Sequence, residues 1–400
     1  MAPIRYGALL IGDDGRIAEV GPAAQVRAPE GVPEEGFPDS IILPGLVNTH
    51  THLELTGFDS AVSDADFTGW IRQVITLKAA RSPDEMLDAA RQGIRDCWAA
   101  GVTTVADTGD TGAAIHAMRE LGASGIAYQE IFGPNPGIAA ERLSEFRERF
   151  DALRQAPTDR VVIGVSPHAP YSVSGPLYKA VADWAWEEGL PLAVHIAESE
   201  EEEQLVQGGS GPFAEQWKAR GIPRLVSGGA TPIEWLERHG VLGERTLCIH
   251  AVRANELDII RLARSRSAVA HCPRSNLRHA GRPAPLAEFL SAGIRVGVGT
   301  DSVASVSPLD LLAEAREARR IAGLSASGAL DLVTRGAAAA IGLEREVGTL
   351  ASGSWGDAVV ITPKHGLAGP DPFEMTLASR VPDVALTLVG GREVYRRPPS

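Results

Sequence analysis

Short apolar runs alternate with amphipathic segments through the middle of the chain. The runs are almost continuously apolar, which is typical of strands that are covered on both faces. Eight such strands are predicted, at residues 41–50, 102–107, 125–132, 161–168, 191–198, 246–252, 268–273 and 294–301. We expect them to lie parallel in one buried sheet.

The segments between these runs are predicted helices with recognisable ends. In residues 82–101, Ser82 can cap the helix, Pro83 fits its first position, Glu85 completes a capping box and Gly101 can end it. Similar helices are predicted at 174–189, 254–265, 284–293 and 308–320. Eight strand–helix units predict an α/β fold in which the strands close into a (β/α)8 TIM barrel.

Two parts of the chain depart from this alternation. Residues 199–244, between the fifth and sixth strands, are long enough to form a lid-like insertion or a pocket wall. At the two ends, a hairpin and further strands are predicted at residues 7–21, 355–363 and 384–396. We expect residues 1–42 and 345–400 to pair into one small sheet domain beside a barrel of residues 43–344.

The charge and the cysteines of the chain limit its partners and its compartment. The 400 residues carry a formal net charge of -13 without a Lys/Arg cluster on any predicted element, so neither nucleic acid nor an anionic membrane surface is an expected partner. No apolar run is long enough to span a bilayer, and the N-terminus lacks a signal-peptide pattern. Because Cys97, Cys248 and Cys272 cannot build a disulfide framework, we expect a cytoplasmic protein, with a homodimer as one open oligomeric state.

Titratable side chains gather at the C-terminal ends of the predicted strands, where barrels of this type carry their catalytic groups. Besides Glu198 and Asp301, six of the ten histidines fall there: His50, His52, His168, His195, His250 and His271. Any one of these histidines alone would more often be a hydrogen-bonded imidazole than a ligand. Independent placement, however, would not concentrate six at one rim of an apolar barrel, so a convergent metal site explains the set better.

His50 and His52 are the first half of this predicted metal site. Side chains two residues apart on a strand share a face, so both imidazoles can hold one ion. His195 and Asp301 are the expected third and fourth ligands, which leaves one position for water. The set suits one divalent ion, with Zn²⁺ as the first choice and Fe²⁺ as the alternative.

A divalent ion at this site would lower the pKa of its bound water to about 7. His250 can then hold that water, and Glu198, three residues beyond His195, can carry protons between the water and a leaving group. The sequence therefore predicts a hydrolase that acts on a small molecule.

These residues, in this order, resemble the amidohydrolase superfamily, and the resemblance covers essentially the whole chain. The motifs are 43-LPGLVNTHTH-52, 195-HIAE-198, His250 in CIHAV, 299-GTDS-302 and 348-GTLASGSWGDAVV-360. They are most similar to the branch with cytosine deaminase, guanine deaminase and the atrazine/triazine hydrolases. The resemblance implies one metal with the four ligands named above, Glu198, His250 and Asp301 as catalytic groups, and a composite β-sandwich built from both termini.

Three departures from the pattern of this superfamily bear on these expectations. Relatives with two metals carry a lysine at the end of the fourth strand, and residues 161–168 contain none, so we expect one metal. The chain begins near the second strand of the usual sandwich, so that either one strand is missing or Met1 is not the natural start. After the seventh strand, residues 271–281 place Arg274 where many deaminases have an Asn-Pro pair.

Four residues are candidates for substrate contacts. Glu54 shares a face with His52 if the strand continues, and His168 resembles the strand-four histidine that contacts substrate in nucleoside-deaminating relatives. Trp70 could supply an aromatic wall, although core packing explains it as well. Arg274 could meet an anionic or carbonyl-bearing substrate, or it could cap its loop as a surface guanidinium.

The resemblance predicts hydrolytic deamination of an aminated heterocycle or nucleoside. Glu198 would take a proton from water and donate it to a ring nitrogen, while metal-bound hydroxide held by Asp301 and His250 attacks the amine-bearing carbon and ammonia leaves. The motifs HTHLEL, SPHAPYS and CPRSN resemble the subgroup that deaminates 6-aminodeoxyfutalosine on a menaquinone route. S-adenosylhomocysteine, methylthioadenosine, guanine and cytosine are alternative substrates. A triazine-type chlorohydrolase or aminohydrolase and a non-catalytic scaffold are the rival functions, and a scaffold would show gaps in the ligand set.

Overall fold

A parallel sheet of eight strands forms the centre of the computed structural model, which describes residues 3–59, 61–63, 66–155, 158–363, 369 and 371–398. The strands pair in chain order around the sheet. They are β4 (Leu46–Thr51), β5 (Val102–Gly109), β6 (Ser124–Ile131), β7 (Val161–Pro167), β8 (Leu192–Ile196), β9 (Thr246–His250), β10 (Ala268–His271) and β11 (Val296–Val298). All eight predicted strands are present, and the predicted (β/α)8 barrel is confirmed.

The first and last strands of the barrel, β4 and β11, meet at the C-terminal end of β4. The backbone N–H groups of Thr300 and Asp301 both donate to the carbonyl oxygen of His50, at 3.1 Å each. This approach needs a glycine, because a Cβ at Gly299 would lie 2.7 Å from the backbone nitrogen of His50. The contact between the first and last strands thus places Asp301 next to His50.

Helices surround the barrel and connect its strands. Those outside the insertion are α1 (Phe67–Ala80), α2 (Pro83–Ala99), α3 (Ala113–Leu121), α4 (Ala139–Arg154), α5 (Gly175–Glu188), α9 (Glu256–Ser265), α10 (Pro273–Ala280), α11 (Leu286–Ser291), α12 (Leu311–Ala322), α13 (Ala326–Asp331), α14 (Arg335–Ala340) and α15 (Pro372–Ala378). Short 3-10 turns occupy η1 (Leu53–Leu55), η2 (Pro136–Ile138) and η3 (Val381–Asp383). The capping box of Ser82 and Glu85 at the start of α2 is confirmed.

Two apolar layers stabilise the barrel. Small and branched side chains fill its interior, among them Val47, Ala106, Ala193 and Leu247, and residues of α14 such as Ala337 pack against them. A larger cluster fills the space between the outside of the strands and the surrounding helices. The strands are therefore covered on both faces, as their continuous apolar pattern predicts.

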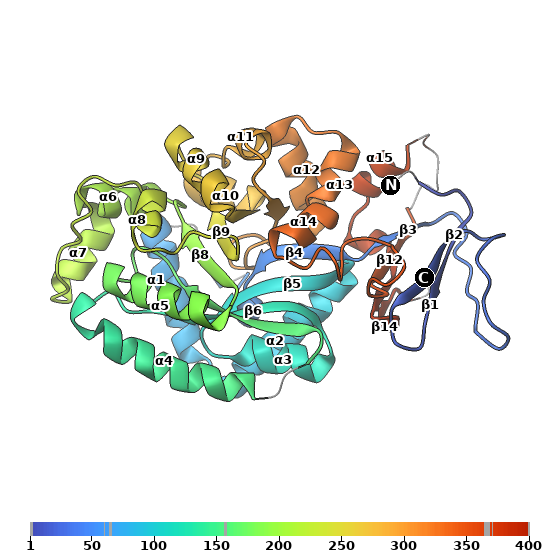
Figure 1. Ribbon diagram of the computed structural model, residues 1–400, viewed down its shortest axis with the longest axis horizontal. Coiled ribbons are helices and arrows are strands. Elements are labelled where there is room, and N and C mark those ends of the chain that lie inside the picture. The colour runs from blue at the N-terminus through green and yellow to red at the C-terminus, as the bar shows by residue number, and fades with distance from the viewer. Residues whose placement is uncertain are drawn as a thin grey trace.

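The long connection after β8 contains helices rather than an open loop. These are α6 (Glu200–Gly208), α7 (Gly211–Ala219) and α8 (Pro232–Arg238). Phe213 and Trp217 of α7 form an apolar cluster with Phe67 of α1, against which Trp70 packs. In Figure 1 these insertion helices lie at the end of the molecule opposite the terminal sheets, which is the end where the barrel strands finish.

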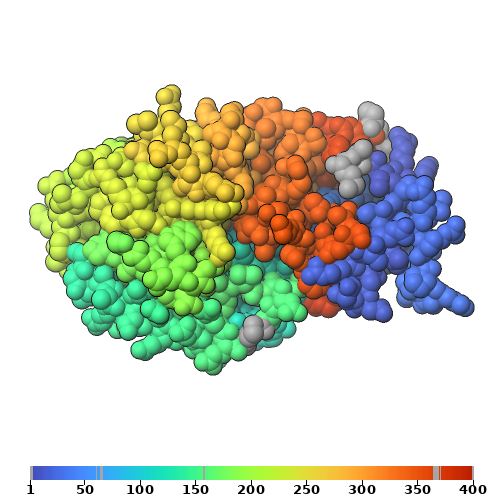
Figure 2. Space-filling view, viewed as in Figure 1, coloured from blue at the N-terminus to red at the C-terminus, as the bar shows by residue number. Residues whose placement is uncertain are grey.

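Both termini contribute antiparallel sheets beside the barrel, as predicted. A hairpin consists of β1 (Gly7–Ile11) and β2 (Ile17–Pro22), and a four-stranded sheet has the order β14 (Arg392–Arg396), β13 (Val384–Val389), β12 (Ala358–Ile361) and β3 (Ile41–Pro44). Arg16 bridges to Trp355, which joins the hairpin to the C-terminal segment. Figure 2 shows the blue N-terminal and red C-terminal segments side by side at this end.

The predicted first strand, residues 41–50, is divided in the structure. Its first part, β3, pairs with β12 in the terminal sheet, and its second part, β4, belongs to the barrel. The break falls at Pro44 and Gly45, because proline has no N–H to continue a ladder and a Cβ at Gly45 would lie 2.1 Å from Oγ1 of Thr103. The terminal sheet therefore leads directly into the strand that carries His50. Among the described residues, no helix has the length and apolar character needed to cross a membrane.

Candidate active site

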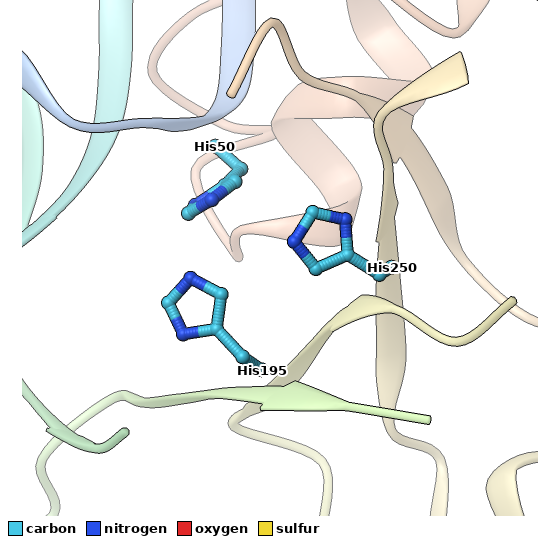
Figure 3. A group of neighbouring side chains, drawn as sticks. All are labelled: His50, His195 and His250. Atoms are coloured by element: carbon cyan, nitrogen blue, oxygen red, sulfur yellow. The ribbon is translucent and has the colours of Figure 1, made fainter. Parts of the chain in front are cut away.

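Several barrel strands end in histidine or acidic side chains that point to one centre. His50 lies on β4, His195 on β8 and His250 at the end of β9, and Figure 3 shows their three rings converging. His52 follows β4 directly, and Asp301 lies three residues beyond the end of β11. All five are at least partly buried, and only His52 is not fully so.

The four predicted ligands lie within a few ångströms of one another. The Nε2 atoms of His50 and His52 are each 3.6 Å from Oδ1 of Asp301. The Nε2 atoms of His52 and His195 are 3.4 Å apart. The ring centroids of His50 and His52 are 4.7 Å apart, and those of His50 and His195 are 4.9 Å apart. The structure therefore brings this set together at one point.

The outer ring nitrogens determine what these histidines present to the centre. Nδ1 of His52 donates to the carbonyl oxygen of Thr108 (2.9 Å), and Nδ1 of His195 donates to that of His168 (3.2 Å). Because a carbonyl only accepts, each ring carries its proton on Nδ1 and turns the lone pair of Nε2 inward. His50 is fully buried, and within the described part of the chain neither of its ring nitrogens has a hydrogen-bond partner.

Burial keeps these imidazoles neutral. It lowers the pKa of His50 to about 3 and holds the pKa of His195 well below its usual range. A buried group of imidazole nitrogens around one carboxylate is a suitable site for a cation. Three imidazole nitrogens and a carboxylate oxygen fit one divalent metal ion, including Zn²⁺.

Glu198 and His250 lie together beside these ligands. Oε1 of Glu198 is 3.4 Å from Nε2 of His250, and both side chains are buried. Burial, together with the negative charge of Asp301, raises the pKa of Glu198 well above its usual range. A carboxyl group with a raised pKa takes up a proton more readily than an ordinary carboxylate and can pass it on, which is what a proton carrier requires.

Asn276 fixes the orientation of His250. Its Oδ1 accepts from Nδ1 of His250 (2.9 Å), and its Nδ2 donates to Nδ1 of His271 (3.0 Å). His250 therefore presents an Nε2 lone pair toward Glu198. His271, which ends a barrel strand as predicted, contacts the centre only through Asn276. Asn276 lies on α10 and not at the end of a strand, so the sequence pattern did not identify it as part of the site.

Further contacts hold the carboxylate of Asp301 and the backbone at Glu198. Ser275 donates to Oδ2 of Asp301 (2.6 Å), and the backbone N–H of Ser302 donates to Oδ1 (2.6 Å). Glu202 accepts from the backbone N–H groups of Ala197 (2.8 Å) and Glu198 (2.9 Å). The left-handed backbone at the strand ends, with φ of +51° at Ala197, +72° at His250, +48° at Ala251 and +59° at Asp301, is a strain typical of functional sites.

Glu54, a predicted substrate contact, is buried in a charge cluster. The strand does not continue past His52, and η1 directs the carboxylate of Glu54 to Nζ of Lys78 (2.5 Å) and Oγ1 of Thr111 (2.5 Å). Lys78 also pairs with Asp110. Each oxygen of Glu54 thus already has a donor, and its contact with substrate stays a prediction.

Trp70 contacts the loop that follows β11, and Arg274 contacts α12. Nε1 of Trp70 donates to the carbonyl oxygen of Ala304 (3.2 Å), and its ring packs 4.4 Å from that of His279. The backbone N–H of Arg274 donates to Oε2 of the buried Glu314 (2.9 Å), and Nη1 of Arg274 is 3.6 Å from Oε1 of the same residue. Both residues are partly exposed, and their roles in substrate binding stay predictions.

His168 lies beside the predicted metal ligands, as its place after the fourth strand suggests. Its ring centroid is 4.8 Å from that of His195, and its Nε2 is 3.9 Å from Oε1 of Glu130. Glu130, near the end of β6, was not among the predicted site residues. The signal that identified the histidines, a polar residue at the C-terminal end of an apolar strand, applies to Glu130 equally.

Comparison with known proteins places this site in a family. The profile of the Amidohydrolase family matches residues 41–394. A 5-methylthioadenosine/S-adenosylhomocysteine deaminase of Moorella thermoacetica is 31% identical over 410 residues, covering 98% of this chain and 91% of the relative. An aminodeoxyfutalosine deaminase of Deinococcus radiodurans is 29% identical over 323 residues, covering 79% of this chain and 76% of the relative.

A solved structure shows the same fold at lower identity. An adenosine deaminase of Xanthomonas campestris, crystallised with bound zinc, superposes with a TM-score of 0.82 at 22% identity, covering 98% of this chain and 88% of that one. The family profile spans far more than half of the chain, and the resemblance carried by the strand-end motifs is confirmed. The chain belongs to the amidohydrolase family and is a hydrolase that acts on carbon–nitrogen bonds.

Proposed function

We propose that this protein is a hydrolytic deaminase of an adenosine-like nucleoside, which replaces a ring amine by oxygen and releases ammonia. One observation carries the proposal: a buried carboxyl group, Glu198, lies 3.4 Å from Nε2 of His250, beside a set of inward imidazole lone pairs that fits a divalent ion. The relatives named above, deaminases of nucleosides, support the choice of substrate class.

The metal and the protein have separate tasks in this reaction. A divalent ion held by His50, His52, His195 and Asp301 would supply hydroxide at neutral pH by lowering the pKa of water. Glu198 takes the proton of that water and delivers it to the ring nitrogen beside the amine-bearing carbon, which makes this carbon more electrophilic. The proton of the hydroxyl group that was added to this carbon then passes through Glu198 to the amine, the carbon–nitrogen bond breaks, and ammonia leaves.

His250 positions Glu198 and the water relative to each other. Because Nδ1 of His250 is committed to Asn276, its Nε2 acts only as an acceptor. A neutral imidazole in this position can accept a hydrogen bond from the water or from protonated Glu198, and burial keeps it neutral by lowering its pKa. The proton path is therefore confined to Glu198.

The substrate within this class is a finer proposal. We expected 6-aminodeoxyfutalosine from the HTHLEL, SPHAPYS and CPRSN motifs, and the relative in Deinococcus supports it. The relative in Moorella supports methylthioadenosine or S-adenosylhomocysteine, and matches more of the chain. Guanine, cytosine and triazines are the remaining alternatives. Zn²⁺ as the metal and a cytoplasmic location also remain proposals, the latter supported by three free, buried cysteines.

The test is an ammonia-release assay on the Zn²⁺-loaded protein with adenosine, methylthioadenosine, S-adenosylhomocysteine, 6-aminodeoxyfutalosine, guanine, cytosine and atrazine. We expect ammonia from at least one adenosine derivative, and turnover reduced by several orders of magnitude in Glu198→Gln at full metal content. Chloride or alkylamine release from atrazine alone would identify a triazine hydrolase instead. Near-normal turnover by Glu198→Gln would exclude the proposed proton carrier.

A further inference from the structure

Two hydrogen-bond acceptors face each other beside the metal ligands. Oε1 of Glu130, near the end of β6, and Nε2 of His168, just after β7, are 3.9 Å apart. Oε1 of Glu130 is also 3.9 Å from Nδ1 of His195. The distance between the first two atoms is too long for a direct hydrogen bond and leaves both able to bind a third group.

The hydrogen bonds around His168 show that its Nε2 is an acceptor. Ser172 donates its one hydroxyl proton to the carbonyl oxygen of Ala169 (3.1 Å), so its oxygen accepts from Nδ1 of His168 (2.7 Å). A neutral imidazole protonated on Nδ1 has a lone pair on Nε2. His168 therefore cannot donate to Glu130.

Oε1 of Glu130 has no protein donor among the described residues. Its side chain is 4% exposed, and its buried Oε1 lacks a hydrogen-bond partner. Its nearest ring donor, Nδ1 of His195, is committed to the carbonyl oxygen of His168. The nearby ammonium of Lys78 is bound by Glu54 and Asp110. Burial raises the pKa of Glu130 well above its usual range. Whether or not the group carries a proton, a buried acceptor oxygen without a donor costs free energy unless a ligand supplies one.

We infer that Glu130 and His168 form a subsite that binds the vicinal hydroxyl groups of the substrate's sugar. Two acceptors side by side require a ligand with two adjacent donors, and a cis-diol is such a group. In an adenosine-like nucleoside, the sugar hydroxyls are the hydrogen-bond donors that remain when the reacting amine faces Glu198. This assignment rests on the proposed function, because it takes the substrate to be a riboside.

The subsite also explains why a carboxylate, rather than an amide, stands at residue 130. A carboxyl group offers oxygen atoms on both arms, whereas an amide replaces one of them by an NH2 donor that cannot accept from a hydroxyl. A site built around unpaired acceptors rejects a ligand that lacks the matching hydroxyl, because the buried acceptors then stay unpaired. Glu130 is therefore expected to select ribosides over deoxyribosides.

The experiment compares adenosine, 2′-deoxyadenosine and 3′-deoxyadenosine as substrates of the Zn²⁺-loaded wild type and of Glu130→Gln. Glutamine keeps the size of the side chain and replaces one acceptor by a donor. Glu141→Gln, an exposed carboxylate in the first turn of α4, is the matched control. Metal content and melting temperature are measured for each protein.

We expect the wild type to prefer adenosine over at least one deoxynucleoside by about 100-fold in kcat/KM. Glu130→Gln should lose about 100-fold on adenosine and less than about 3-fold on that deoxynucleoside, whereas Glu141→Gln should match the wild type. Equal losses on all three substrates, or a wild type that uses all three equally well, would overturn the subsite while leaving the deaminase proposal intact. The second of these results needs no variant, so a Glu130→Gln protein that fails to fold does not block the test.

Two other results would overturn the subsite in different ways. A second equivalent of Zn²⁺ in the wild type that is lost in Glu130→Gln would identify a cation as the ligand of this carboxylate. If the metal-loaded wild type releases no ammonia from any nucleoside in the assay described under the proposed function, that result would refute the proposed function, and the riboside subsite with it.

Discussion

Nδ1 of His250 lies 2.9 Å from Oδ1 of Asn276, and this contact decides which nitrogen of His250 faces Glu198. The amide reaches the imidazole from α10, and its other end is held by His271. A side chain outside the barrel strands thus selects the tautomer of an imidazole inside the site.

Replacing Asn276 should impair catalysis more than stability. In Asn276→Ala the proton of His250 is free to move to Nε2, so we expect kcat to fall about 10- to 100-fold with KM little changed. Steady-state kinetics on the best nucleoside substrate measure the effect, with Gln92→Ala on the exposed face of α2 as the control. An unchanged kcat would show that the amide does not select the tautomer.

Removal of the metal should abolish activity and lower the melting temperature. Without a cation, the inward lone pairs of His52 and His195 and the unpartnered ring of His50 gather around a buried carboxylate, which is unfavourable. Dialysis against a chelator followed by calorimetry and re-addition of Zn²⁺ tests this prediction. His50→Ala should bind less metal than the wild type under the same conditions. Full activity of the chelated protein would contradict the assignment of these residues.

The pair of Glu54 and Lys78 should contribute to stability. Their contact is 2.5 Å long, and the carboxylate is 1% exposed. Glu54→Gln leaves a partly buried ammonium with one partner fewer, so we expect a loss of about 1–3 kcal/mol in the free energy of unfolding. Urea denaturation of Glu54→Gln, Lys78→Met and the double variant measures the coupling between the two residues.

The same variants separate the two roles open to Glu54. A structural pair gives a coupling of about 0.5–3 kcal/mol with KM unchanged in Glu54→Gln. Negligible coupling together with a raised KM would instead favour the contact with substrate that we expected from the sequence.

The stability of the protein should fall as the pH rises from 5 to 8. Burial raises the pKa of Glu314 to about 8, although the N–H and the guanidinium of Arg274 oppose this shift. Between the unfolded value of about 4.5 and the folded value, the native state holds a proton that the unfolded chain releases. The contribution is therefore complete below pH 4.5 and is lost on approach to pH 8, at no more than about 1.4 kcal/mol per pH unit.

Urea denaturation at pH 5, 6.5 and 8 measures this dependence. Glu314→Gln cannot titrate and still offers an oxygen to the N–H of Arg274, so its stability should vary less with pH than that of the wild type. Parallel curves for the two proteins would show that Glu314 is not the group responsible. Glu202, whose pKa burial raises to about 7, changes stability in the same direction and remains in both proteins.

The barrel and its ring of histidines could be predicted because two simple rules coincide. Continuous apolar runs identify strands covered on both faces, and the C-terminal ends of parallel strands share one rim. His195 and His250 therefore lie close together although they are 55 positions apart in the sequence. No information on side-chain orientation is needed to find a set of this kind.

The sequence did not predict the orientation of every side chain near the site. The expectation for Glu54 assumed that the strand continues, but β4 ends at Thr51 and a 3-10 turn begins at Leu53. The direction of Glu54 is instead set by Lys78, which arrives from α1, and no local pattern links two residues so far apart. Asn276 was missed for the related reason that it reaches the site from a helix.

The continuity of β3 and β4 means that the C-terminal segment anchors the strand that carries His50, a proposed metal ligand. Residues Ile41–Pro44 are held by Ala358–Ile361, and β4, which carries His50, begins directly after Gly45. A protein truncated before Ala358 would keep every ligand in its sequence, yet its first barrel strand would enter the barrel from an untethered end. Tags and truncations at the C-terminus therefore act on the catalytic end of the molecule from its opposite end.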